Sequence, residues 1–117
     1  MSDGKIDTVR SSSSGTPGRA VSQARGQRLV LDSSSHPHLD AFTNSEAFLA
    51  GISSCGVTLI EKHARDTGVP VTGMEVTISG LRSRADPTRF QRIDVRFDIR
   101  GVDRRQAEAL VETWRNR

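Results

Sequence analysis

An uncharged run over residues 47–60 limits the fold of this chain more than any other feature. The polar residues in the run are few and small: Ser53, Ser54 and Thr58. The Thr43-x-x-Glu46 spacing before it is typical of a helix N-cap, in which each side chain accepts a hydrogen bond from the other residue's backbone N–H. A helix that is apolar on nearly every side needs cover on every side. We therefore expect a long helix, buried at the centre of the fold, that ends near Gly68.

Short β-strand patterns lie on both sides of this helix. Residues 20–22 and 28–31 could form a hairpin, and residues 74–79 and 92–100 alternate between apolar and polar side chains. A last helix begins at Asp103, where the Asp103-x-x-Gln106 spacing suits an N-cap, and carries an apolar stripe at helical spacing. This order predicts an α+β fold: an antiparallel sheet with a long buried central helix and a second helix on one face.

Residues 1–18 have the composition of a disordered arm. The stretch 11–18 contains only serine, glycine, threonine and proline, so no side chain there can build a core. Such a segment explains why the hydrophobic fraction is only 34% and the mean hydropathy −0.46. We expect a disordered N-terminal arm over residues 1–18 and one folded domain over residues 19–117, which is too short for two independent cores.

The sequence carries no sign of export or of membrane insertion. It has no apolar run of about 18 residues, and serines rather than apolar residues follow its first charged positions. Its one cysteine, Cys55, cannot form an internal disulfide. These features predict a soluble, cytoplasmic protein with no membrane partner.

Arginine is concentrated in the last third of the chain. Residues 82–117 hold ten basic and six acidic side chains, which raises the hypothesis of nucleic-acid binding. On the predicted strand over residues 92–100, however, aspartates flank the arginines and cancel the potential that a phosphate backbone needs. The chain has no tyrosine, and Trp114 falls on the apolar stripe of the last helix, so stacking platforms are lacking. We expect no nucleic-acid partner.

Cys55 is the first candidate for chemistry. It lies inside the uncharged helix between Ser54 and Gly56, whose small side chains leave room for a ligand or another backbone. A lone cysteine in a helix is more often a small core residue. The position is about three turns from the helix start, where the helix dipole alone does not activate a thiol. An arginine from elsewhere would have to favour the thiolate.

His36, His38 and Asp40 form a second candidate, a His-x-His-x-Asp cluster in a predicted loop. Three such side chains could bind zinc. Pro37 restricts their geometry, however, and no second pair of ligands appears at metal spacing. A solvated loop is the favoured interpretation, and we expect neither a metal nor a cofactor. A serine hydrolase is weaker still, because the chain has no Gly-x-Ser-x-Gly motif.

The order of these motifs resembles the OsmC/Ohr family, named for osmotically induced and organic hydroperoxide resistance proteins. Residues 43–55, Thr-Asn-Ser-Glu-Ala-Phe-Leu-Ala-Gly-Ile-Ser-Ser-Cys, are similar to the central-helix signature of that family. The resemblance extends to residues 18–22, to Val-Pro-Val at 69–71, to the strand over residues 90–100 and to the helix start at 102–103. It covers roughly residues 18–117 and lacks the family's C-terminal segment with a second cysteine.

The resemblance implies an OsmC-like fold and an intertwined homodimer with its sites at the interface. It implies a thiol-dependent peroxidase for oxidative stress defence, which reduces organic hydroperoxides with a thiol reductant such as a lipoyl group. In that chemistry a cysteine thiolate attacks the peroxide and becomes a sulfenic acid, which a second cysteine resolves. An arginine oriented by a glutamate favours the thiolate and binds the peroxide oxygen.

Carried over residue by residue, the resemblance assigns three catalytic positions. Cys55 matches the nucleophile, and Glu46 lies nine residues before it, as in the family pattern. The arginine-pairing glutamate of the Ohr branch would fall at Ser45, and its arginine near Thr16, with Arg19 as the nearest substitute. The alternative function is a non-catalytic OsmC-like homodimer that binds a small apolar ligand at its interface.

Overall fold

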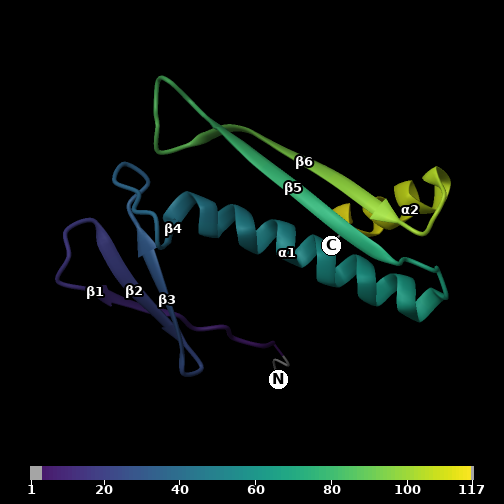
Figure 1. The fold of residues 1–117 in the computed structure, drawn as a ribbon, viewed down its shortest axis with the longest axis horizontal. Coiled ribbons are helices and arrows are strands. Elements are labelled where there is room, and N and C mark those ends of the chain that lie inside the picture. The colour runs from purple at the N-terminus through teal and green to yellow at the C-terminus, as the bar shows by residue number, and fades with distance from the viewer. Residues whose placement is uncertain (1–3, 117) are drawn as a thin grey trace. The chain divides into compact units, whose positions relative to one another are not determined.

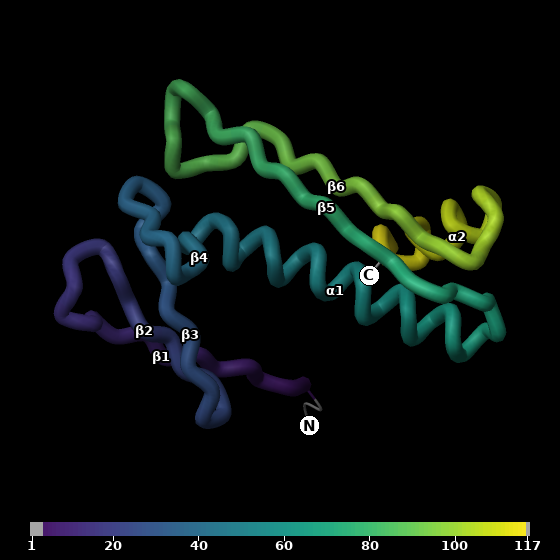
Figure 2. Tube along the Cα trace, viewed as in Figure 1, coloured from purple at the N-terminus to yellow at the C-terminus, as the bar shows by residue number. Residues whose placement is uncertain are grey.

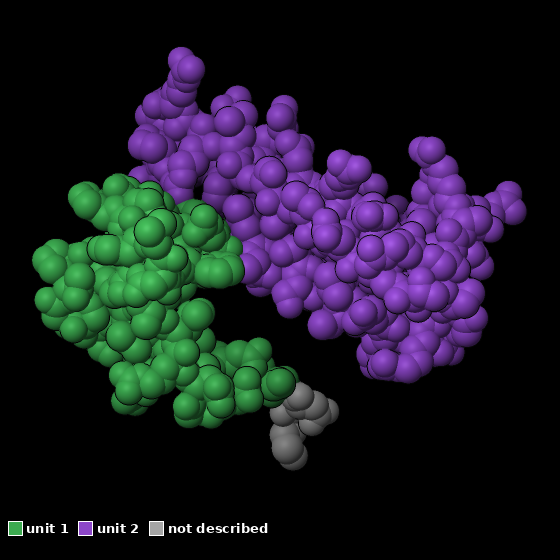
Figure 3. All heavy atoms as spheres, in the orientation of Figure 1, with its two compact units in different colours: residues 1–48 green, residues 49–117 purple. Residues whose placement is uncertain are grey.

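The chain folds as an α+β protein in two compact units, residues 1–48 and 49–117 (Figures 1 and 3). The structure, a computed structural model, describes residues 4–116. The predicted fold class is confirmed, but the strands divide between two sheets, one in each unit, where we expected one sheet. The predicted boundary after residue 18 is not where the structure divides the chain.

The first unit is a four-stranded sheet. Its strands lie in the order in which they follow in the chain: β1 (Arg10–Ser13), β2 (Arg19–Ala24), β3 (Gln27–Asp32) and β4 (Phe42–Thr43). The first three strands pair antiparallel, and β4 pairs parallel to β3. The predicted hairpin is therefore present as β2 and β3. No described residue of this unit is a buried hydrophobic, so the unit has no apolar core of its own.

Strand β1 lies in the segment for which the composition predicted disorder, and that prediction is wrong for Arg10–Ser13. The strand is fully exposed and pairs with β2 along all its residues. Ser11 Oγ lies 2.7 Å from Ser22 Oγ, and Ser14 Oγ donates a hydrogen bond to the Arg19 carbonyl. A strand that is held by backbone and hydroxyl hydrogen bonds needs no apolar side chain, which is why hydrophobicity did not reveal it.

The second unit holds the long helix, a hairpin and the last helix. Helix α1 (Asn44–Thr67) starts in the first unit and continues into the second, where β5 (Gly73–Arg82), β6 (Phe90–Arg100) and α2 (Arg104–Arg115) follow (Figure 2). The predicted alternation is confirmed, because apolar residues of β5 pair with apolar residues of β6: Met74 with Ile99, Val76 with Phe97 and Ile78 with Val95.

Both helices begin with the predicted caps. The Thr43 N–H donates to Glu46 Oε1 (2.9 Å), and the Glu46 N–H donates to Thr43 Oγ1 (3.2 Å). Asp103 and Gln106 form the same reciprocal pair at the start of α2. Helix α1 ends before Gly68, whose φ of +74° is a left-handed conformation that glycine adopts without steric cost.

A glycine brings α1 close to the aromatic part of the core. Gly56 is buried, and a Cβ at this position would lie 3.4 Å from the Phe97 ring and 3.5 Å from Trp114 Nε1. Phe97 and Trp114 pack edge to face with ring centroids 5.1 Å apart. Below them, Ile60 and Leu110 are almost fully buried, so this contact sets the position of α1 on the hairpin and on α2.

The prediction that the central helix is buried on every side is wrong for the single chain. The buried residues of α1 are Gly56, Ile60 and Ala64, which lie on one face. Gly51 and Cys55 are exposed, because a two-stranded sheet and one short helix can cover only one side. The helix therefore presents an uncharged surface that this unit leaves open.

Within residues 4–116, no helix combines the length and the hydropathy that crossing a membrane would require.

We expect Ile60→Ala to lower the free energy of unfolding by about 2–5 kcal/mol, because Ile60 is fully buried and its loss leaves a cavity. Leu81→Ala is the matched control, since Leu81 is 50% exposed and should cost less than about 1 kcal/mol. Urea unfolding followed by the fluorescence of Trp114 measures both variants. Equal losses would contradict this assignment of the core.

Candidate functional site

Cys55 projects from the open face of α1. Its thiol is free and exposed, and within the described part of its own unit Sγ has no hydrogen-bond partner. The hydroxyls nearby are already satisfied by the helix: Ser53 Oγ donates to the Leu49 carbonyl (3.1 Å) and Thr58 Oγ1 to the Ser54 carbonyl (3.2 Å). The surroundings of the thiol on the helix are therefore small and uncharged.

No charged side chain on α1 lies close to Cys55. The helix carries no ionisable residue between Glu46 and Glu61 other than Cys55 itself. The thiol is also about three turns from the helix start, beyond the first turn over which the dipole acts. A cation that stabilised a thiolate here would have to come from another segment of this chain or from a second copy.

Glu46, the second predicted catalytic residue, caps α1. Its carboxylate accepts the Thr43 N–H, so part of its hydrogen-bonding capacity is used at the helix N-terminus. Along α1, Glu46 precedes Cys55 by nine residues, about two and a half turns. The capping interaction explains this glutamate without a catalytic role, and its role towards an arginine stays a prediction.

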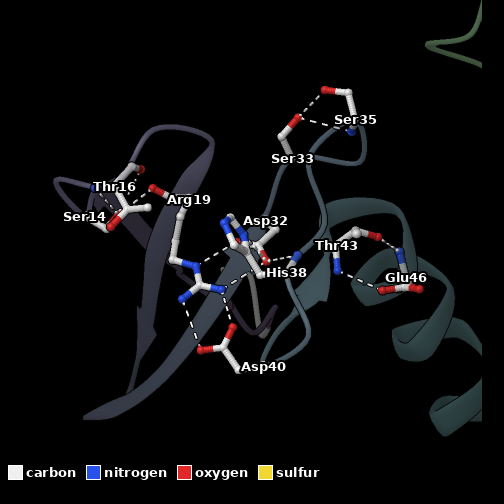
Figure 4. A network of polar contacts seen from close by, with 10 residues as sticks. All are labelled: Ser14, Thr16, Arg19, Asp32, Ser33, Ser35, His38, Asp40, Thr43 and Glu46. Carbon is white, nitrogen blue, oxygen red and sulfur yellow. Dashed lines mark hydrogen bonds and ion pairs between the residues drawn. The ribbon is translucent and has the colours of Figure 1, made fainter.

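Arg19, the third predicted catalytic residue, is the centre of an ion-pair network in the first unit (Figure 4). Its guanidinium binds Asp32 through two contacts, Nε to Oδ1 (2.7 Å) and Nη2 to Oδ2 (3.1 Å). It also binds Asp40, with Nη2 2.6 Å from Oδ1 and Nη1 3.3 Å from Oδ2. The Asp32 side chain is fully buried, whereas that of Asp40 is 73% exposed.

The network favours the charged form of every member. Hydrogen bonds from Arg19 hold the pKa of Asp32 well below its usual range and lower the pKa of Asp40 in the same direction. Hydrogen bonds to Asp32 and then to Asp40 raise the pKa of the Arg19 guanidinium. Two carboxylates thus balance one cation, and the cluster ties β2, β3 and the following loop together.

The histidine cluster joins this network. The His38 N–H donates to Asp32 Oδ2 (3.1 Å), and His38 Nδ1 lies 3.1 Å from the same oxygen. His36 lies against Ser35, whose hydroxyl is 3.3 Å from His36 Nδ1. Across residues 4–116, the histidine, cysteine and acidic side chains form no group of three that could hold a metal ion. His38 and Asp40 therefore fasten the loop to Asp32 and Arg19.

Asp32 is the residue that the sequence reasoning missed. A signal was available, because a two-residue turn at Arg25 and Gly26 sets the hairpin register and places Arg19 directly opposite Asp32. An aspartate at the end of an apolar strand, facing an arginine across the ladder, predicts a cross-strand ion pair. The structure thus brings Arg19 together with Asp32 and Asp40, and its role at Cys55 stays a prediction.

We expect Arg19→Ala to loosen the first unit, because it leaves the buried Asp32 carboxylate without its cation. The folded-state pKa of Asp32 is lowered, so its stabilising effect is complete above its unfolded pKa, about 3.9, and is lost as the pH falls through the folded value. Amide hydrogen exchange in β2 and β3 should be faster in Arg19→Ala than in the wild type at pH 7.

The control for that experiment is Arg92→Ala. The Arg92–Asp94 pair is exposed on both sides, so its loss should leave the exchange rates in β2 and β3 unchanged. Unchanged exchange in Arg19→Ala as well would show that the network does not hold the sheet.

The family model of OsmC-like proteins matches residues 36–117. An OsmC-like protein from Mycoplasma pneumoniae has a TM-score of 0.83 at 15% identity, over 97% of this chain and 82% of that one. None of the curated proteins matches the sequence.

Two further solved structures carry names that refer to hydroperoxides. The organic hydroperoxide resistance protein OhrB of Bacillus subtilis has a TM-score of 0.65 at 16% identity, over 96% of this chain and 84% of that one. The organic hydroperoxide resistance protein of Elizabethkingia anophelis has a TM-score of 0.73 at 13% identity, over 99% and 85%. These likenesses concern the fold, and the family model covers well over half of the sequence. The chain belongs to the family of OsmC-like proteins.

Proposed function

We propose that the chain is a thiol-dependent peroxidase that reduces organic hydroperoxides through Cys55. The observation that carries this proposal is the exposed, unpaired thiol on the long helix of an OsmC-like fold. The names of the structural neighbours from Bacillus subtilis and Elizabethkingia anophelis support the substrate class. An exposed thiol can be reached by a peroxide, whereas a buried structural cysteine is inert.

The first step is a nucleophilic displacement on the peroxide. The Cys55 thiolate attacks one oxygen of the hydroperoxide, an S–O bond forms and the O–O bond breaks. The leaving alkoxide takes a proton and departs as an alcohol, so the substrate is reduced by two electrons and Cys55 becomes a sulfenic acid. A thiol then attacks the sulfenic sulfur, water leaves and a mixed disulfide remains.

The second half of the cycle needs thiols from another molecule. Residues 1–117 contain no second cysteine, so the mixed disulfide must be resolved by a further thiol. A dithiol such as a lipoyl group supplies both thiols at once and leaves as a cyclic disulfide. Without such a reductant, the sulfenic acid is oxidised further to sulfinic and sulfonic acid.

A second copy of the chain completes the site in this proposal. Two observations support a homodimer: the uncharged open face of α1 around Cys55, and a first unit that lacks buried hydrophobic residues in its described part. Arg19 and Glu46 are the proposed activating residues. Arg19 can serve the thiolate only by exchanging its exposed partner Asp40, because its charge is already balanced by two carboxylates.

The alternative is a non-catalytic homodimer that binds a small apolar ligand at its interface. One observation favours it: apart from Cys55, α1 has no ionisable residue between Glu46 and Glu61, so the helix itself offers no group that would activate the thiol. Such a surface accepts apolar molecules without activating a thiol.

Treatment with an organic hydroperoxide should add oxygen to Cys55. Intact-mass spectrometry is expected to show one added oxygen, about 16 Da, and then two and three under excess peroxide, because no internal thiol protects the sulfur. Turnover should be low and should depend on an added dithiol. Cys55→Ser is the control and should gain no oxygen at this position. A folded wild type that stays unmodified while a small free thiol is oxidised would favour the ligand-binding alternative.

We expect the protein to be a dimer of about twice its 12.8 kDa chain mass in multi-angle light scattering. Ser54→Glu should shift the mass towards the monomer, because it places a charge on the open face of α1 beside Cys55. Thr77→Glu, on the exposed face of β5, is the matched control and should not change the mass. A monomer mass for the wild type at micromolar concentration would overturn the proposed assembly.

A further inference from the structure

The proposed function gives Arg19 the task of stabilising the Cys55 thiolate, and an arginine in that role needs a carboxylate that holds it in one orientation. Glu46 is the carboxylate predicted from the sequence. It accepts the Thr43 N–H at the start of α1, and within residues 4–48 it makes no ion pair with Arg19. The orienting carboxylate is therefore one of those that do contact the guanidinium.

Asp32 holds one edge of the Arg19 guanidinium and is itself fixed. Nε and Nη2 of Arg19 donate to its two carboxylate oxygens at 2.7 and 3.1 Å. Asp32 Oδ2 also accepts the His38 N–H at 3.1 Å, and the Asp32 side chain is fully buried. Two parallel hydrogen bonds fix the plane of a guanidinium as well as its position. Asp32 therefore sets the direction in which the other edge of Arg19 points.

Asp40 occupies that other edge, formed by Nη1 and Nη2 of Arg19 (Figure 4). It comes from the loop between β3 and β4, and its side chain is 73% exposed. Water can hydrate an exposed carboxylate once it is released, so this exchange costs little. Release of Asp32 would instead leave a buried charge without its cation. Asp40 is therefore the exchangeable partner of Arg19, and Asp32 is the permanent one.

We propose that Asp32 is the positioning residue for Arg19 in the thiol chemistry, and that Asp40 is a competing carboxylate on the edge that a thiolate or a peroxide oxygen uses. The inference rests on the proposed function, which gives Arg19 its task at Cys55. Once Asp40 leaves, Nη1 and Nη2 present N–H donors to an incoming anion. Arg19 and its two carboxylates together carry one negative charge, and the release of Asp40 brings the cluster to neutrality, which favours a thiolate nearby.

The test is the pH dependence of the rate at which iodoacetamide modifies Cys55 in the full chain. Asp40→Asn should react about threefold faster at pH 6, because it removes the competing carboxylate. Asp32→Asn should react as slowly as Arg19→Ala, since a guanidinium without its fixed partner is no longer oriented. The midpoint of the pH profile should move down in Asp40→Asn and up in Asp32→Asn. The double variant Arg19→Ala/Asp32→Asn should be no slower than either single variant.

Two further measurements separate positioning from a loss of structure. Asp40 is exposed, so Asp40→Asn should keep the wild-type hydrogen exchange in β2 and β3 while its thiol reacts faster. The Arg19 Nε–H signal in a proton–nitrogen correlation spectrum reports the contact with Asp32 directly. It should stay protected from solvent exchange in Asp40→Asn and lose that protection in Asp32→Asn. Asp94→Asn is the matched control, because Asp94 pairs with Arg92 at the surface, and it should change neither the rate nor the signal.

The outcomes distinguish this inference from the proposed function on which it rests. An Asp40→Asn variant that reacts no faster than the wild type would overturn the inference, as would a wild-type pH profile in Asp32→Asn. A loss of reactivity in Glu46→Gln, with none in Asp32→Asn, would return the orienting role to Glu46. In each of these cases Cys55 would still be activated. A wild-type Cys55 that reacts no faster in the folded protein than in urea would instead contradict the proposed function and remove the basis of the inference with it.

Discussion

The close approach of α1 to the hairpin at Gly56 is the contact on which the rest of the second unit depends. Without a side chain at this position, the helix lies against Phe97 and Trp114, and Ile60 becomes fully buried one turn further on. The same contact decides what remains open, because burying one face of an uncharged helix leaves its other face exposed. Cys55 lies on that open face, so the proposed assembly and the proposed chemistry would involve the same surface.

Local patterns predicted most of the fold. The caps at Thr43 and Asp103 depend on residues three positions apart, and the alternation in β5 and β6 depends on a period of two, so the sequence contains both directly. Strand β1 was missed because its serines pair through backbone and hydroxyl groups. The all-round burial of α1 was predicted wrongly because burial depends on how much surface the rest of one chain can cover.

The sequence predicted which residue types belong to the candidate site, but it predicted less of how these residues are arranged. Cys55 is easy to identify from the sequence because it is the only thiol there. Its exposure, however, depends on tertiary contacts that no local pattern encodes. Arg19 shows the opposite case. Its pairing with Asp32 follows from the two-residue turn, whereas its second partner, Asp40, comes from a loop whose path the sequence does not specify. An arginine therefore has to be considered together with the carboxylates that pair with it before it is assigned a catalytic role.

The rate at which iodoacetamide modifies Cys55 at pH 6 tests the central claim most directly. A cysteine in an unfolded chain is mostly the unreactive thiol at this pH, because only the thiolate attacks the reagent. If Cys55 is an activated nucleophile in a site completed by a second copy, the folded protein should react faster than the same protein in urea, and dilution below the dimer range should remove the difference. A folded protein whose Cys55 reacts only after unfolding would contradict the claim and assign the thiol a structural or ligand-binding role.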